Sequence, residues 1–162
     1  MTVSGHRGGD RRSAKGETDP EAERRYALAD AKAGERALEV LSEKLRLEVT
    51  PRSRVARTYY DTFDRRLGAE RTLLYRSVAD GETSLRWESL AGKLLRRLAT
   101  RKEPGLATDL PAGPFRDAIA PLLDVRRLLP IARLKGHAQA AAVLDTRGKT
   151  IVRLSLEQFS VV

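Results

Sequence analysis

Two glutamates near the start of the chain have the spacing of a cation-binding pair. Glu21 and Glu23 are separated by one residue within 21–28, where alternating polar and apolar residues predict a strand. On a strand both carboxylates leave the same face, with backbone positions about 6.5–7 Å apart. Mg²⁺ and Mn²⁺ favour such oxygen ligands, usually together with substrate phosphates. A pair of solvated strand carboxylates has the same spacing, so the pattern alone leaves both interpretations open.

The second chemical signal is an excess of arginine. The 162 residues include 31 Lys plus Arg and 22 Asp plus Glu, a formal net charge of +9, and Arg outnumbers Lys 24 to 7. Guanidinium groups form bidentate hydrogen bonds with phosphate oxygens, whereas lysine acts as a point charge. We therefore expect an anionic, phosphorylated partner. Some of these cations fall in 1–19, a polar segment that we predict to be a disordered basic tail.

Length and composition exclude several classes of protein. A chain of 162 residues corresponds to one domain, which we place over 20–162. The absence of Cys removes disulfide frameworks, thiol nucleophiles and Cys-based metal sites, and it fits a cytoplasmic protein. No apolar run approaches the roughly 20 residues that span a bilayer, so we expect no membrane partner. P-loop and Rossmann glycine motifs are absent too, which leaves those nucleotide-binding classes without support.

Antiparallel strands make up most of the elements that would position these residues. Leucines at helical spacing predict an amphipathic helix over 35–47, and a second, short helix is expected over 114–123. Strands are expected at 54–62, 71–78, 83–90, 94–103, 126–136, 138–145 and 150–156. Each strand has a charged face, which would meet water in an open sheet or line the interior of a closed barrel. Alternation alone does not choose between these arrangements.

Two motifs together resemble the CYTH family, the triphosphate tunnel metalloenzymes. The first, Glu21, Glu23 and Arg25, is similar to the family's E-x-E-x-K opening. The second, similar to its Y-Y-D-T-x-D-x-x-L segment, consists of Tyr59, Tyr60, Asp61, Thr62, Asp64 and Leu67. The resemblance implies an α+β fold, an antiparallel β-barrel or tunnel with a few packing helices. Its lumen would bind triphosphate, polyphosphate or a nucleoside triphosphate with Mg²⁺ or Mn²⁺.

The same resemblance implies activities and partners. Some members of the family hydrolyse triphosphate and others cyclise ATP. The fold often precedes a helical CHAD domain, which is a further candidate partner. A small phosphorylated ligand is favoured over nucleic acid.

The resemblance also implies two sets of site residues. The metal-binding carboxylates would be Glu21, Glu23, Asp145 and Glu157. The phosphate-binding cations would be Arg25, Arg54, Arg76, Arg101, Arg133 and Lys135, with Glu103 as a further lumen residue. Arg76 matches the second Arg of an L-R-x-R strand, whose first Arg position is Leu74. We expect these side chains to face one shared lumen.

Departures from the family pattern argue against efficient catalysis. Glu88 stands where a phosphate-binding Lys is expected, and Arg153 stands where an acidic residue is common. A closing strand with another E-x-E pair is expected beyond Val162, so we predict an incomplete tunnel. Replacing Lys with Glu changes the charge at the phosphate by two units, and phosphoryl transfer depends on positioning and charge neutralisation.

We therefore expect a phosphate-binding domain with weak or no catalysis. One alternative is an active Mg²⁺- or Mn²⁺-dependent inorganic triphosphatase. A second alternative is a general nucleic-acid-binding basic protein.

Overall fold

All strands of the described chain belong to one antiparallel sheet. The computed structural model describes residues 26–162. Its strands are β1 (Arg46–Val49), β2 (Ser53–Asp61), β3 (Thr72–Ala79), β4 (Glu82–Ser89), β5 (Leu94–Ala99), β6 (Leu129–Leu144) and β7 (Thr150–Val161). Its helices are α1 (Ala31–Lys44), α2 (Arg66–Ala69), α3 (Pro114–Leu123) and the short 3-10 helix η2 (Ala107–Asp109). None of these described helices has the length and apolarity needed to cross a bilayer.

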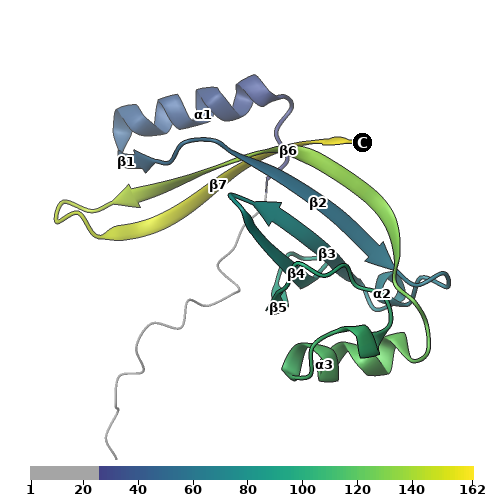
Figure 1. Cartoon of the computed structure of the whole chain (residues 1–162). Helices are drawn as coiled ribbons and strands as arrows, with labels where there is room; N and C mark the ends of the chain where they lie inside the picture. Colours follow the sequence, from purple (N-terminus) through teal and green to yellow (C-terminus); the bar gives the residue numbers. More distant parts are fainter. Residues whose placement is uncertain (1–25) are drawn as a thin grey trace, which may run out of the picture.

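The long strand β6 organises the sheet. β7 pairs with one edge of β6, while β1 and β2 follow one another along its other edge. Beyond β2 come β3, β4 and β5, each antiparallel to its neighbour. The sheet curls into a half-barrel, with α1 against the β6–β7 hairpin and α3 against the layer of β3 to β5 (Figure 1). Within residues 26–162, β5 and β7 do not pair, so the described barrel is open between them.

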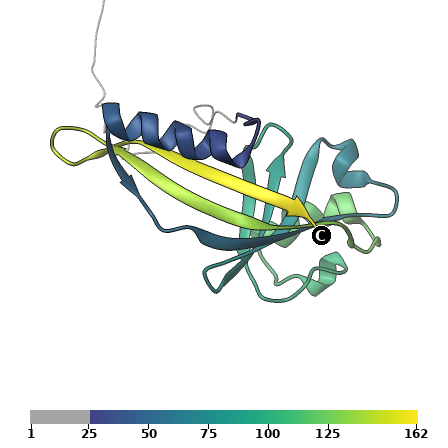
Figure 2. The same cartoon turned by 90° about the horizontal axis from the view of Figure 1, so that it is seen from above.

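The outer face of the half-barrel is the one that the helices cover. Leu74, Leu85 and Trp87 lie on this face and pack against α3 and η2. At the other end of the sheet, Gly34 of α1 lies against the side chain of Leu156, which is on the same face of β7. Figure 2 shows α1 lying along the β6–β7 hairpin. The opposite, concave face is called the inner face below.

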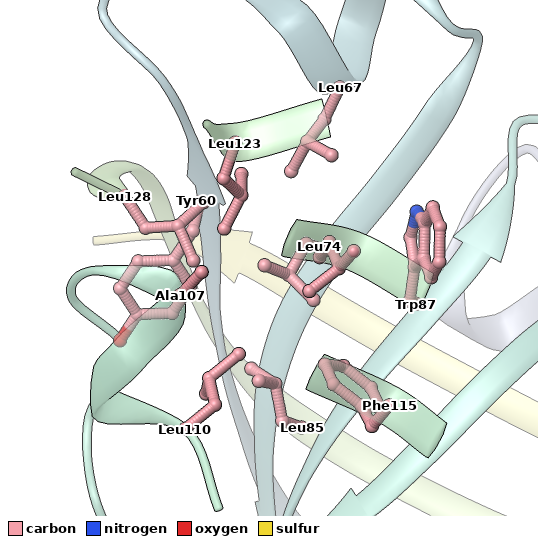
Figure 3. Packing of buried hydrophobic residues seen from close by; sticks show 11 residues of the cluster. Tyr60, Leu67, Leu74, Leu85, Trp87, Ala107, Leu110, Phe115, Leu123 and Leu128 are labelled. Atoms are coloured by element: carbon pink, nitrogen blue, oxygen red, sulfur yellow. The ribbon is translucent and has the colours of Figure 1, made fainter. Parts of the chain in front are cut away.

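The hydrophobic core lies between the outer face and α3. Phe115, Ile119 and Leu123 recur every four residues in α3, so they form one stripe that is buried. They pack in one cluster with Leu74 and Leu85, both fully buried. Figure 3 shows Phe115 and Leu123 together with these two leucines. Burying a leucine of this kind contributes roughly 1.5–3 kcal/mol. This core fixes which face of β3 and β4 points outward.

The predicted α+β class and antiparallel sheet are confirmed, and α3 has its predicted bounds. The two strands predicted at 126–136 and 138–145 are wrong, because β6 runs through both without a break. Gly136 interrupts the apolar pattern, but it keeps its pairing with Val55 and Phe159. The strand predicted at 94–103 ends earlier, at Ala99.

The first predicted elements also needed correction. The helix expected at 35–47 begins at Ala31, because the side chain of Asp30 caps it by accepting a hydrogen bond from Ala33 N at 2.6 Å. It ends at Lys44, and the chain then enters β1. Of the strand expected at 21–28, residues 26–28 are not in a strand, and the rest lies outside the described residues.

Candidate functional site

The inner face carries an arginine that reaches across two strands. Arg57 of β2 donates two hydrogen bonds to Glu157 of β7, at 3.0 Å from Nη1 and 2.5 Å from Nη2. Its guanidinium lies 4.5 Å from the ring centroid of Phe159 and 5.2 Å from that of Tyr75. Burial by itself lowers the pKa of Arg57, but the hydrogen bonds and charge of Glu157 outweigh burial, so the pKa lies above its usual value. Arg57 is therefore a fixed cation on the inner face.

Small residues of β6 make this reach possible. Gly136 and Ala138 occupy the inner-face positions of β6 between Val55 and Ser53 of β2 and the residues Phe159 and Glu157 of β7. A Cβ atom on Gly136 would lie 1.8 Å from the backbone oxygen of Gln158. Only glycine fits there, and the guanidinium of Arg57 can pass over it to β7.

A second arginine pair lies on β4. Arg86 binds the carboxylate of Glu88 through Nε at 3.2 Å and Nη2 at 3.1 Å, and Tyr75 donates a hydrogen bond to the same carboxylate at 2.7 Å. Glu88 is buried, with 2% of its surface exposed. Burial, followed by the hydrogen bond to Glu88, raises the pKa of Tyr75 well above the usual value of a phenol. Tyr75 is thus a neutral donor that holds Glu88 in place.

These groups form one connected cluster, which we call the inner cluster: Arg57, Tyr59, Tyr75, Arg86, Glu88, Glu157 and Phe159. Tyr75 lies at its centre, since its ring contacts Tyr59 at 5.1 Å between centroids and faces both Arg57 and Arg86. Beside the cluster is a depression of about 500 Å³, lined among others by Ser53, Ala138 and Ser155. Ser53 and Ala138 share a cross-strand row with Glu157, so the depression adjoins the Arg57–Glu157 pair.

The inner cluster has the chemistry of an anion site whose cations already have carboxylate partners. Two guanidinium groups converge on one phenol, and each is neutralised by one carboxylate. The Nε atom of Arg57 is buried and has no hydrogen-bond partner among the described residues. A bound anion could accept a hydrogen bond from this Nε–H group. For the other N–H groups of Arg57 and Arg86, it would have to compete with Glu157 and Glu88.

The structure brings most of the predicted phosphate-binding cations together, but on the outer face. Thr58 of β2 pairs with both Arg76 and Arg133, which therefore lie on either side of it on the face of Leu74 and Tyr60. Lys135 and Arg54 follow on the same face, because they alternate with inner-face residues of β6 and β2. We call Arg54, Arg76, Arg133 and Lys135 the basic strip. The expectation that these cations share the inner lumen is wrong.

The strand β3 shows how this expectation differs from the structure. Matching Leu74 and Arg76 to an L-R-x-R strand implied that these two residues face the lumen. Tyr75 and Ser77 occupy the inner-face positions, because they pair with Arg86 and Ser84. A one-residue shift moves every side chain of a strand to the other face.

Arg101 and Glu103 follow β5 and also lie by the outer face. The carbonyl oxygen of Arg101 accepts a hydrogen bond from Arg76 Nη2 at 3.2 Å. Burial, followed by the negative charge of Glu103, raises the pKa of Tyr60, an outer-face residue. The charge of Glu103 therefore acts on an outer-face residue, and its predicted place in the lumen stays a prediction.

The predicted metal ligands do not converge within the described chain. Glu21 and Glu23, like Arg25 and the tail 1–19, lie outside the described residues. Asp145 accepts hydrogen bonds from the backbone of Arg147 and Lys149 in the β6–β7 turn, while Glu157 binds Arg57. Glu157 is seven residues along β7 from Thr150, roughly 23 Å at the rise of a strand. In residues 26–162, no group of three or more His, Asp or Glu could hold a metal ion.

The Y-Y-D-T-x-D segment has a structural role here. Asp61 is buried and accepts hydrogen bonds from the backbone N–H groups of Thr62, Leu67 and Gly68, so it ties the end of β2 to α2. Asp64 accepts a hydrogen bond from Thr62 Oγ1 and is bound by Arg126 at 2.6 Å. The bond from Thr62, and then those from Arg126 and Arg66, lower the pKa of Asp64 to about 2.

Sequence reasoning missed Arg57 and Tyr75. Arg57 and Tyr59 alternate on β2, and Tyr75 is paired with Arg86, whose strand was correctly predicted. The charged face shared by Arg86 and Glu88 was visible in the sequence. The partner of Arg57 was not, because Glu157 is 100 residues further along the chain.

Comparisons with known proteins add little to this description. Neither a protein family model nor a curated protein matches the chain. Among solved structures, a protein from Bacillus halodurans named "putative adenylate cyclase" is similar, with 16% identity and a TM-score of 0.48. The match covers 82% of this chain and 75% of the other. A match of this size establishes neither family nor activity.

Proposed function

We propose that the inner cluster binds a short polyphosphate anion: triphosphate, a longer polyphosphate or the phosphates of a nucleoside triphosphate. The observation that carries the proposal is the convergence of Arg57 and Arg86, from separate strands, on the ring of Tyr75 at 5.2 and 6.0 Å. Guanidinium groups form bidentate hydrogen bonds with phosphate oxygens. The resemblance of two sequence motifs to the CYTH family agrees with this class of ligand.

Glu88 and Glu157 should make the binding weak. Each carboxylate is bound to one of the two arginines, so a phosphate must displace it or share the guanidinium. A phosphate close to Glu88 also meets like-charge repulsion. We therefore expect the affinity for polyphosphate to rise when either carboxylate is removed.

Catalysis should be weak or absent. The described carboxylates do not fit a Mg²⁺ or Mn²⁺ ion, because Glu157 is bound to Arg57 and Asp145 to its own turn. Phosphoryl transfer depends on metal and cation positioning around the phosphate oxygens. We expect phosphate release from tripolyphosphate with Mn²⁺ to match that of a Glu21→Ala/Glu23→Ala variant. Faster release by the natural sequence would favour an active triphosphatase instead.

Calorimetric titration with tripolyphosphate tests the binding site. Arg57→Ala/Arg86→Ala should weaken binding by about tenfold or more, since each hydrogen bond to a charged group contributes roughly 1.5–3 kcal/mol. Arg133→Ala/Lys135→Ala removes the same charge from the outer face and should leave the affinity unchanged. Equal losses in both variants would show that tripolyphosphate responds only to net charge, and the inner site would be rejected.

A further inference from the structure

The outer face carries a group of cations without matching carboxylates. Arg54, Arg133 and Lys135 of the basic strip are exposed, and Arg76 is half-buried. None of the four forms an ion pair with a carboxylate of the described chain. No outward-facing position of β2, β3, β4, β6 or β7 is Asp or Glu. Acidic residues beside these strands include Glu103, whose charge acts on Tyr60, and Glu35 of α1, which lies 2.6 Å from Arg52, two residues before Arg54. The strip is therefore a positive surface with no acidic residue within it.

Neither of the outer helices covers the strip. α3 packs on Leu74, Leu85 and Trp87, and α1 lies against Leu156 of β7. The strip lies on β2, β3 and β6. Its exposed members Arg54, Arg133 and Lys135 are accessible to a partner, whereas Arg76 is half-buried and donates to the carbonyl oxygen of Arg101.

The cations are spaced along and across the strands. Arg133 and Lys135 are two residues apart on β6, about 6.6 Å. Arg76 and Arg133 flank Thr58 on neighbouring strands, roughly 10 Å from each other at the backbone. Arg54 pairs with His137, the next outward-facing residue after Lys135. The strip thus presents positive charge at steps of about 6–10 Å along two directions.

We propose that the basic strip binds the sugar–phosphate backbone of a nucleic-acid duplex without reading its sequence. In a nucleic acid, a whole sugar separates successive phosphates, which suits cations spaced in this way. In inorganic polyphosphate, a single bridging oxygen separates successive phosphates. Its charges are therefore closer together than the cations of the strip. Affinity for a nucleic-acid backbone comes mainly from such cations.

The scarcity of exposed aromatic rings along the strip favours a duplex over a single strand. Proteins that bind single strands combine cations with exposed aromatic side chains on which bases stack. The Tyr and Trp residues on the outer face of the described strands are Tyr60 and Trp87, which are only 4% and 8% exposed. The exposed ring of Phe63 lies beyond the end of β2 beside Arg126, and His137 adds a single exposed imidazole next to Arg54. A duplex keeps its bases inside and presents phosphates, which are the groups that the strip can bind. This surface is separate from the inner cluster, so the inference does not depend on the proposed triphosphate site.

Fluorescence anisotropy with a labelled 20-base-pair duplex tests the proposal on the full chain. Arg54→Ala/Arg133→Ala/Lys135→Ala should weaken binding by about tenfold or more at low salt and make the slope of log K against log salt shallower by about 2.7. The matched control Lys93→Ala/Arg147→Ala/Lys149→Ala removes three exposed cations elsewhere and should retain the natural slope. Circular dichroism verifies that both variants fold.

Further arms separate the possible ligands. A second duplex of unrelated sequence should bind equally well, whereas a single strand of the same length and a long inorganic polyphosphate should compete more weakly per phosphate. Equal losses in the strip variant and its control, or competition by polyphosphate as strong as that by unlabelled duplex, would overturn the proposal. Arg57→Ala/Arg86→Ala should leave duplex binding unchanged, so failure here is distinguishable from failure of the inner site.

Discussion

The two faces of the same sheet treat arginine in opposite ways. On β2, Arg57 points inward, is half-buried and is held by Glu157, whereas Arg54 points outward, is exposed and has no carboxylate partner in the described chain. The inner face pairs Arg86 with Glu88 as well, while the basic strip gathers four cations without an acid. The net charge of +9 therefore says little about where an anion binds. The face of the sheet on which each cation lies says more about where an anion can bind.

Desolvation accounts for this difference. A cation that is withdrawn from water costs free energy unless a carboxylate or other acceptor replaces the water. Arg57 retains only 16% side-chain exposure, so its stability on the inner face depends on Glu157. The exposed members of the strip remain hydrated and need no partner. On the two proposals, an anion at the inner face must compete with carboxylates, whereas contact of a larger polyanion with the outer face should be sensitive to salt.

The largest expected effect comes from adding a side chain at Gly136, where β6 and β7 lie close together. Gly136→Ala would place a Cβ 1.8 Å from the backbone oxygen of Gln158, so β6 and β7 must separate. We expect a loss of about 3 kcal/mol in the free energy of unfolding, at the upper end of overpacking costs, together with loss of tripolyphosphate binding. Urea denaturation measures the first effect.

Gly81→Ala is the matched control. Gly81 has φ +79° and no atom within 4 Å of a built Cβ, so the change should cost about 1 kcal/mol from backbone strain alone. If both variants lose the same free energy, the close approach of β6 and β7 is not what makes Gly136 necessary.

Removing the inner carboxylates should change affinity in the opposite direction from removing the arginines. Glu88→Gln keeps an acceptor for Tyr75 but removes the charge that competes for Arg86. Glu157→Gln does the same for Arg57. We expect each to raise tripolyphosphate affinity by about threefold to tenfold, since hydrogen bonds to a neutral group are roughly half as strong. Weaker binding by both variants in calorimetry would contradict the role of these carboxylates as competitors.

Asp64 provides a pH reference that belongs to neither face. Its folded pKa of about 2 lies below the unfolded value of about 3.9, so its contribution to stability is complete above about pH 4 and is lost as the pH falls toward 2. In the Asp64→Asn variant, the melting temperature should depend less on pH between about pH 4 and pH 2. The variant and the natural protein are compared by calorimetry from pH 5 to 2. An unchanged slope in this window would mean that the bonds to Thr62 and Arg126 do not hold the carboxylate in its charged form.

The smallest expected effect is on the stability of the strip variant. Arg54→Ala/Arg133→Ala/Lys135→Ala removes exposed side chains that make no ion pair with a described carboxylate, so the thermal midpoint should be unchanged or slightly higher as like-charge repulsion falls. Differential scanning calorimetry at low salt measures it. A marked loss of stability would show that these cations support the fold, which would remove the contrast between the faces.

Local sequence patterns predicted much of this fold. The alternation in β2 to β4 and the apolar stripe of α3 come from nearest-neighbour sterics and burial, so Arg86 and Glu88 could be placed on one face and α3 could be bounded correctly. Gly136 suggested a break because it has no side chain to continue the pattern. In the structure it is instead the residue that lets β7 approach β6.

The candidate site was harder to predict because alternation does not tell which face is concave. That choice is made by α3 packing on Leu74 and Leu85, a contact between distant segments. The motif resemblance placed Arg76 in the lumen, whereas the pairing of β2, β3 and β4 places it on the outer face. The pairing of Arg57 with Glu157 depends on β6 lying between β2 and β7, which no local pattern contains.

The central claim is that short polyphosphates bind to the inner face. The most direct measurement follows the Nε–Hε signals of the arginine side chains by NMR while tripolyphosphate is added. Arg57 and Arg86 should shift and saturate together, whereas Arg54 and Arg133 should move only slightly and without saturation. Saturable shifts at Arg54 and Arg133, with Arg57 and Arg86 unmoved, would place the phosphate on the outer face and contradict the account.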